Sequence, residues 1–144
     1  MFNTTNAIGF LLSAANKAHE AELDKKVRHL GVTAVQGAIM DQLYQHEGIS
    51  QKELARYCQK DPSSLTKILD ILSKKELIVR QPDKEDRRAF KLYLTAKGTE
   101  VHQACVPIAE AHNKTMVEGI MLEDLEITKA VLRKIVRNMQ ETEV

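Results

Sequence analysis

The chain has 144 residues, of which 43% are hydrophobic and 28% are charged, and its formal net charge at pH 7 is +1. This composition is typical of a soluble globular protein, and the length suits a single domain, 1–144, with a core of its own. No apolar run approaches the roughly 18 residues of a membrane span and no basic segment stands at the start, so we expect a cytoplasmic protein with no membrane partner.

Two helices are predicted in the first third of the chain. Apolar residues at helical spacing predict a helix over 7–30, which Gly31 ends. Thr33 is suited to cap a second helix, and Gly48 stops it.

A helix-turn-helix pattern follows. Ser50, with Glu53 three residues later, forms a capping box that begins a short helix. Asp61 can cap the next helix, and Pro62 fits its first position, where the missing N–H is not needed. That second helix has one apolar stripe, formed by Leu65, Ile68, Leu69 and Leu72.

The opposite face of the second helix is polar. A short hydroxyl near a helix N-terminus can approach a phosphate or a base edge closely, and the helix dipole favours phosphate there. We therefore weigh two interpretations of this face, an ordinary solvated surface and a surface that reads a DNA major groove. Its residues are Ser63, Lys67, Asp70 and Lys74, with Ser64 and Thr66 at the flanks.

Strand-like stretches over 78–81 and 89–94 predict a hairpin. Between them, residues 82–88 are polar and turn-forming, and they include the adjacent Arg87 and Arg88. Arginines in an exposed loop suit a DNA minor groove, whose negative potential attracts guanidinium groups. The alternative is a charged tip that only blocks edge pairing between sheets.

The rest of the chain predicts two further helices. Thr95 caps the first, and Pro107 inside it removes a helical hydrogen bond, so we expect a kink or a break there. Gly119 ends this helix, and the last one covers 123–139. The terminal helices have broad apolar faces that one small lobe cannot easily bury, so we expect them to pack against a second copy of the chain.

These elements predict a mainly α (α+β) fold, a winged helix-turn-helix with about six helices and a small β-hairpin wing that dimerises through its N- and C-terminal helices. We expect 33–98 to form a DNA-binding lobe, and 1–32 with 99–144 to form a helical dimerisation lobe. From Ser50 to Gly98 there are 12 Lys and Arg against 7 Asp and Glu, a net charge of +5, and the remainder carries −4. Positive charge is thus concentrated in the lobe predicted to meet DNA.

Four short motifs carry a resemblance to a known family. They are Ser63-Ser64-Leu65-Thr66, Leu77-Ile78-Val79-Arg80, the wing residues Asp83 to Arg88, and Leu94-Thr95-Ala96-Lys97-Gly98. On these motifs the chain resembles the MarR family of transcriptional regulators, and the resemblance extends over nearly all of its length. One departure is Glu76, where the family usually has glycine. If Glu76 must adopt a left-handed cap, the strain is about 1 kcal/mol.

The resemblance implies a homodimer bound to a double-stranded DNA operator. Two reading helices and two wings about one twofold axis would meet a pseudo-palindromic sequence. Members of the family bind effectors, often phenolic acids or other lipophilic aromatics, between the dimer helices and the reading lobe. We therefore expect a small aromatic or lipophilic effector, with no effector-site residue assigned and no cofactor.

The residues expected to bind DNA come from the reading helix and the wing. In the wing, Arg88 is expected to enter the minor groove with Arg87 beside it, and Asp86 is placed to orient the arginine. The predicted DNA-binding set is Ser63, Ser64, Thr66, Lys67, Asp86, Arg87 and Arg88, with Lys52, Arg56 and Lys91 as weaker candidates for the DNA backbone.

Other chemistry has less support in the sequence. Cys58 and Cys105 lie on apolar helix faces, where a free cysteine behaves as a small hydrophobe, and a redox-active thiol is the alternative. The five histidines show no i, i+4 metal-binding pair, which leaves metal sensing as a minor alternative. No motif of a hydrolase or a nucleotide-binding enzyme is present, so we predict that the protein is not an enzyme.

We predict a ligand-responsive, homodimeric, sequence-specific DNA-binding regulator, a repressor. The first alternative is a winged-helix module for protein–protein contact, with the basic wing docked on an acidic partner. The second is a regulator of the same fold that responds to redox state or to a metal.

Overall fold

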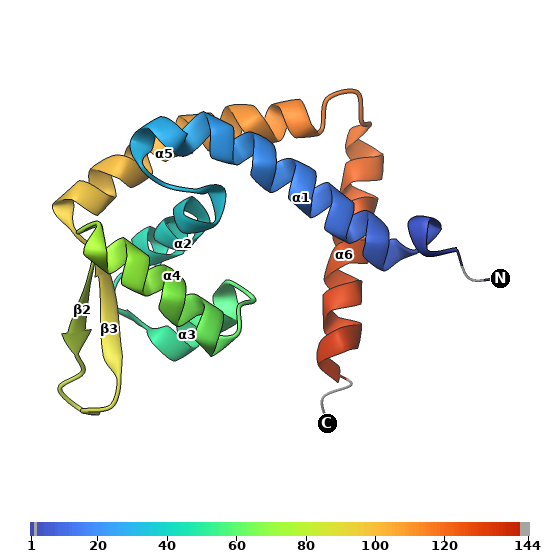
Figure 1. Ribbon diagram of the computed structural model, residues 1–144. Helices are drawn as coiled ribbons and strands as arrows, with labels where there is room; N and C mark the ends of the chain where they lie inside the picture. Colours follow the sequence, from blue (N-terminus) through green and yellow to red (C-terminus); the bar gives the residue numbers. More distant parts are fainter. Residues whose placement is uncertain (2, 142–144) are drawn as a thin grey trace. The chain divides into compact units, whose positions relative to one another are not determined.

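A computed structural model describes residues 1 and 3–141, and Figure 1 shows its elements in chain order. The described chain has six α-helices and one three-stranded sheet, which confirms the predicted winged helix-turn-helix. No helix in these residues is long and apolar enough to cross a membrane. The elements are η1 (Thr4–Asn6), α1 (Ile8–Val27), η2 (Arg28–Leu30), α2 (Ala34–Gln45), β1 (Ile49–Ser50), α3 (Gln51–Tyr57), α4 (Pro62–Lys74), β2 (Ile78–Pro82), β3 (Phe90–Leu94), α5 (Ala96–Met116) and α6 (Leu122–Glu141).

The chain divides into two compact units, Met1–Glu110 and Ala111–Val144. The first unit holds α1 to α4, the sheet and most of α5, and the second holds the end of α5 and α6. The division into a DNA-binding lobe over 33–98 and a separate dimerisation lobe stays a prediction.

The wing is part of a small antiparallel sheet in which β3 lies between β1 and β2. β2 pairs with β3 so that Ile78 lies opposite Leu94. β1 has only two residues, and its Ile49 lies opposite the fully buried Leu92. β1 is absent from the predicted strands because two residues are too few to show the alternation of a strand.

The hydrophobic core of the first unit explains the apolar stripe of α4. Leu65, Leu69 and Leu72 are 0% exposed, and Ile68 is half-buried. Because these side chains pack into one cluster with α2, α3 and the sheet, the polar face of α4 is turned away from the core. The other large, fully buried members of this cluster are Ile39, Met40, Leu43, Leu54 and Leu92.

Side-chain caps begin three helices at the predicted residues. Thr33, Ser50 and Asp61 are the N-caps of α2, α3 and α4, and each side chain accepts a backbone N–H of the first turn. Pro62 takes the first position of α4. These caps satisfy N–H groups that have no partner within the helix, so they set where each helix starts.

α5 continues through Pro107 from Ala96 to Met116, so the helix does not break there, and the other expected outcome, a kink, stays a prediction. Proline at this position removes the hydrogen bond to the carbonyl of Gln103. Both Pro107 and Gln103 are exposed, and water can therefore bond that carbonyl. The loss of one exposed helical hydrogen bond is not enough to end the helix.

Rows of exposed apolar side chains mark α1 and α6. At the start of α1, Ile8, Phe10 and Leu11 are each close to half exposed or more. No described residue of α6 is buried. Contiguous apolar surface of this kind is typical of a protein–protein contact. The exposed apolar residues of α6 include Ile127, Val131, Leu132, Val136 and Met139.

A tight corner at Glu76 ends α4. The N–H of Glu76 bonds the carbonyl of Ser73 at 2.9 Å, and the N–H of Leu77 bonds that of Leu72 at 3.0 Å. This pair of bonds is a Schellman C-cap, which needs a left-handed residue at its centre. Glu76 has a φ of +61°, as expected from its place in the family's usual glycine position.

Replacing Glu76 with glycine should therefore stabilise the protein. Glycine adopts a left-handed φ without the steric cost of Cβ, so Glu76→Gly is expected to raise the free energy of unfolding by about 1 kcal/mol. Urea denaturation followed by circular dichroism measures this change. Glu76→Ala is the matched control, since it removes the same side chain and keeps Cβ; an equal gain in both variants would contradict the explanation.

Candidate nucleic-acid interface

The exposed face of α4 carries the predicted DNA-reading residues. Ser63 and Lys67 are exposed and lie one helical turn apart. They present a hydroxyl and an ammonium group to solvent on the same side of the helix, which suits contact with a groove or a phosphate.

Ser64 forms hydrogen bonds with the N-cap of α4. It is half-buried, and its hydroxyl donates to Oδ2 of Asp61 at 2.7 Å while its backbone N–H donates to Oδ1 at 2.9 Å. These bonds lower the pKa of the Asp61 carboxyl, and the backbone bond has a larger effect than the hydroxyl bond. Ser64 thereby fixes the first turn of α4, and its oxygen keeps only acceptor capacity for DNA.

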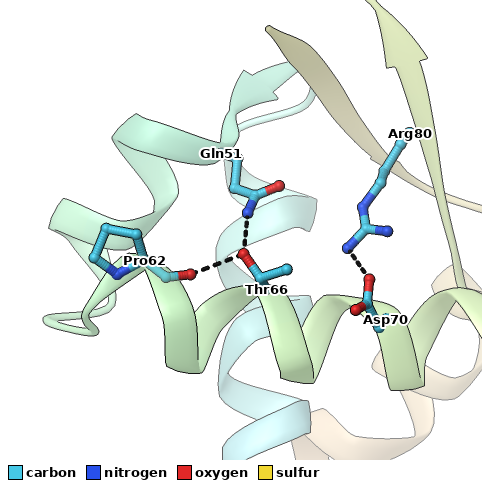
Figure 2. Close-up of polar contacts among 5 residues, drawn as sticks. All are labelled: Gln51, Pro62, Thr66, Asp70 and Arg80. Atoms are coloured by element: carbon cyan, nitrogen blue, oxygen red, sulfur yellow. Dashed lines mark hydrogen bonds and ion pairs between the residues drawn. The ribbon is translucent and has the colours of Figure 1, made fainter. Parts of the chain in front are cut away.

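Thr66 connects α4 to α3. Figure 2 shows its hydroxyl between Pro62 and Gln51. The hydroxyl donates to the Pro62 carbonyl and accepts Nε2 of Gln51, each at 2.8 Å. Thr66 was predicted to contact DNA directly; the structure places its hydroxyl in contacts within the protein, and Gln51 beside it.

An ion pair joins the reading helix to the wing. Nη2 of Arg80 on β2 lies 2.8 Å from Oδ1 of Asp70 on α4 (Figure 2). Asp70 follows Thr66 by one turn, so both contacts lie along the same side of α4. The guanidinium group neutralises a carboxylate that would otherwise repel DNA phosphates, and it links β2 to the helix.

The wing tip is folded by its own polar groups. The N–H of Asp83 bonds the carbonyl of Ala89 at 3.0 Å, and the N–H of Ala89 bonds that of Asp86 at 3.1 Å. Side-chain oxygens of Asp83 and Asp86 accept the N–H groups of Glu85 and Arg88, each at 3.0 Å. Aspartate bonds to the backbone two residues on are typical of tight turns.

Arg87 and Arg88 are both exposed at this tip. Asp86 was predicted to orient the Arg88 guanidinium, but its carboxylate contacts the backbone N–H of Arg88, and no ion pair joins the two side chains in the described wing. Asp86 thus sets the backbone from which both arginines project.

The three weaker candidates are all exposed. Lys52 and Arg56 lie one turn apart on α3, and Lys91 lies on β3 between Ser50 of β1 and Gln81 of β2. Positive side chains therefore occur on α3, α4, the sheet and the wing tip of the first unit.

The sequence pattern missed three positioning contacts. The local sequence pattern assigns no contact to Gln51 or Arg80. Lys75 is a third residue of this kind, and its Nζ lies 2.7 Å from the carbonyl of Gly31 and 3.1 Å from Oε1 of Gln36. These partners are 10 to 44 residues apart in sequence, so no local periodicity could indicate them.

The two thiols lie in surroundings that disfavour redox sensing. Burial raises the pKa of the Cys105 thiol and that of the half-buried Cys58, where Lys60 opposes the effect in part. A less ionised thiol reacts more slowly with oxidants. Within the described part of the chain, no three His, Cys, Asp or Glu residues are placed to hold a metal ion.

Several known proteins are similar to this chain. The sequence model of the MarR family matches residues 32–90. The HTH-type transcriptional repressor NicR of Pseudomonas putida is 25% identical over 135 residues, which cover 94% of this chain and 85% of NicR. The S. aureus MepR–DNA complex has a similar fold, with a TM-score of 0.85 and 26% identity over 92% of this chain and 98% of MepR. BpsR of Bordetella bronchiseptica, in a structure concerning regulation of its DNA binding by 6-hydroxynicotinic acid, has a TM-score of 0.86 and 21% identity over 94% of this chain and 97% of BpsR.

An exposed reading helix and a basic wing on this fold define a winged helix-turn-helix transcriptional regulator. The matched segment, 32–90, begins before α2 and reaches past the wing tip, so it contains both elements. The segment 32–90 therefore resembles the MarR family, in agreement with the sequence motifs.

Both thiols should react at higher pH in the folded protein than in the unfolded chain. Because burial raises their pKa values, the thiolate fraction rises only at a more alkaline pH, and with it the rate of reaction with a disulfide reagent. The pH midpoint of that rate, measured in buffer and in denaturant, separates ionisation from simple access. Cys58→Ser and Cys105→Ser assign the two reactions, and a native midpoint below the unfolded one would contradict the prediction.

Proposed function

We propose that the protein is a homodimeric, ligand-responsive repressor that binds a pseudo-palindromic DNA operator. In each half-site α4 occupies the major groove, and Arg88 at the wing tip enters the minor groove. The protein acts by binding and release of DNA, without catalysis.

One observation carries this proposal, namely that the first unit exposes basic side chains on two separate elements, α4 and the wing, of one sheet-and-helix core. α4 exposes Ser63 and Lys67, and the wing exposes Arg87 and Arg88. The corner after α4 and the Asp70–Arg80 pair fix the wing to the helix. The likeness to MepR in its complex with DNA supports this use of the fold.

Dimerisation is proposed from the exposed apolar side chains. Side chains such as Phe10 on α1 and Val136 on α6 are exposed in a single chain. A second copy would cover them and would place two reading helices about a twofold axis, which matches a pseudo-palindrome.

A small aromatic effector is proposed from the relatives. NicR is named a repressor, and the structure of BpsR concerns regulation of its DNA binding by 6-hydroxynicotinic acid. An effector that binds the DNA-free state more tightly would lower operator affinity by shifting the equilibrium between two states.

The test is a fluorescence titration of the protein against duplex from the upstream region of its own gene. Random duplex at the same salt serves as competitor. A preference of about 10³-fold or more supports the proposal. Equal, weak and steeply salt-dependent binding to both duplexes would contradict it and would favour a wing that docks an acidic protein partner.

Arg88→Ala should weaken operator binding by roughly 1–3 kcal/mol. The reason is that the side chain is exposed and takes no part in the folding of the tip, which uses the Arg88 backbone. Thermal stability and dimerisation should not change. Arg28→Ala removes the same charge outside the 33–98 lobe and serves as control; equal operator affinity of wild type and Arg88→Ala would remove the wing from the mechanism.

Lys67→Ala should make operator binding less dependent on salt. If the Lys67 ammonium neutralises one phosphate, the slope of log K against log salt falls by roughly one unit. Titrations at four salt concentrations give this slope. Lys17→Ala, on α1, should keep the wild-type slope, and an unaltered slope for Lys67→Ala would exclude the phosphate contact.

A further inference from the structure

The side chain of Gln51 does not cap α3. It is the first residue of α3, whose N-cap is the preceding Ser50. The Gln51 side chain reaches across to α4, and its Nε2 donates to Oγ1 of Thr66 at 2.8 Å (Figure 2). The two residues are 15 positions apart in sequence, so this bond fixes the side-chain amide relative to the reading helix.

The chemistry of Thr66 determines which way this amide faces. A hydroxyl has one proton, and that of Thr66 is donated to the Pro62 carbonyl at 2.8 Å. Towards Gln51 the hydroxyl can therefore only accept, so the amide must turn its nitrogen to Thr66 and its Oε1 away from it. The usual ambiguity between amide oxygen and nitrogen is removed by this relay.

The oriented amide keeps one N–H and the carbonyl oxygen for an outside partner. A donor and an acceptor side by side on a glutamine match N7 and the N6 amino group of adenine in the major groove. The Thr66 hydroxyl, in contrast, already donates its only proton to the Pro62 carbonyl, so it is poorly suited to read a base.

The Gln51 amide lies beside the face of α4 that is proposed to enter the major groove. Thr66 is exposed on α4 and lies one turn after Ser63 and one turn before Asp70. Gln51 is half-buried, so its side chain is restrained while its amide edge borders this face. The adjacent carboxylate of Asp70 is paired with Arg80, which removes a charge that would compete for the amide or repel DNA.

We propose that Gln51 is a specificity-determining residue that recognises an adenine in each half-site, and that Thr66 is the positioning residue that orients its amide. This inference rests on the proposed operator binding by α4. It assigns a base contact to Gln51 of α3 and no base contact to Thr66 of the reading helix.

The experiment begins with selection of duplexes from a randomised library by the wild-type protein. The selected consensus duplex, and variants with each base pair of one half-site changed, are then titrated at one salt concentration with four proteins, with a control variant and with the Gln51→Ala, Thr66→Val double variant. The four proteins are wild type, Gln51→Ala, Thr66→Val, which keeps shape but removes the acceptor, and Thr66→Ser, which restores it. Lys52→Ala is the matched control, since it removes an exposed neighbour on the same helix.

Gln51→Ala should lose at least about fivefold of discrimination at one A·T pair and keep it at the others. Thr66→Val should lose discrimination at the same pair, Thr66→Ser should retain it, and Gln51→Ala should have little further effect in a Thr66→Val background. Lys52→Ala should weaken binding to every duplex alike.

Two results would overturn the inference, and they differ in what they mean for the proposed function. If the wild type selects a consensus but Gln51→Ala keeps its full discrimination, or weakens all duplexes equally, Gln51 only packs α3 on α4 and operator binding stands. If the wild type selects no sequence, the inference and the proposed function fail together.

Discussion

The reading helix is held at its C-terminal end by the first turn of α5. The carbonyls of Lys75, Glu76 and Leu77 accept bonds from Lys97 Nζ at 3.2 Å, Thr95 Oγ1 at 2.7 Å and the Thr95 N–H at 3.0 Å. Gly98 is necessary here, because a Cβ on it would lie 2.0 Å from the Leu77 carbonyl oxygen. The exit of α4, the start of β2 and the start of α5 therefore share one junction, and a change in the direction of α5 must act on the reading helix.

The polar residues of α4 form two groups with different roles. Ser63 and Lys67 face solvent, whereas Thr66 and Asp70 are engaged by residues of α3 and β2. Contacts of the second kind determine how rigidly the helix, the wing and α3 are presented together. Such support for contacting side chains is a general requirement for precise binding.

Local patterns predicted most of the fold and only part of the site. The apolar stripe of α4 and the three N-caps each depend on a few adjacent residues, so the sequence alone indicates them, whereas the left-handed Glu76 follows from the family resemblance. The contacts of Gln51 and Arg80 depend on how the strands and helices pack, which leaves no periodic signal. Of the two outcomes expected at Pro107, a kink or a break, the break does not occur, because the loss of one exposed helical hydrogen bond is not enough to end α5.

The wing tip is a nearly self-contained loop. Its backbone and side-chain bonds join Asp83, Glu85, Asp86, Arg88 and Ala89 to one another, and β2 and β3 are paired independently below it. A related gene could therefore exchange this short loop as a block, with the sheet and the core left intact. In the proposed complex, operator preference at the wing can in this way diverge by small insertions and substitutions, while the sequence of α4 evolves under separate constraints.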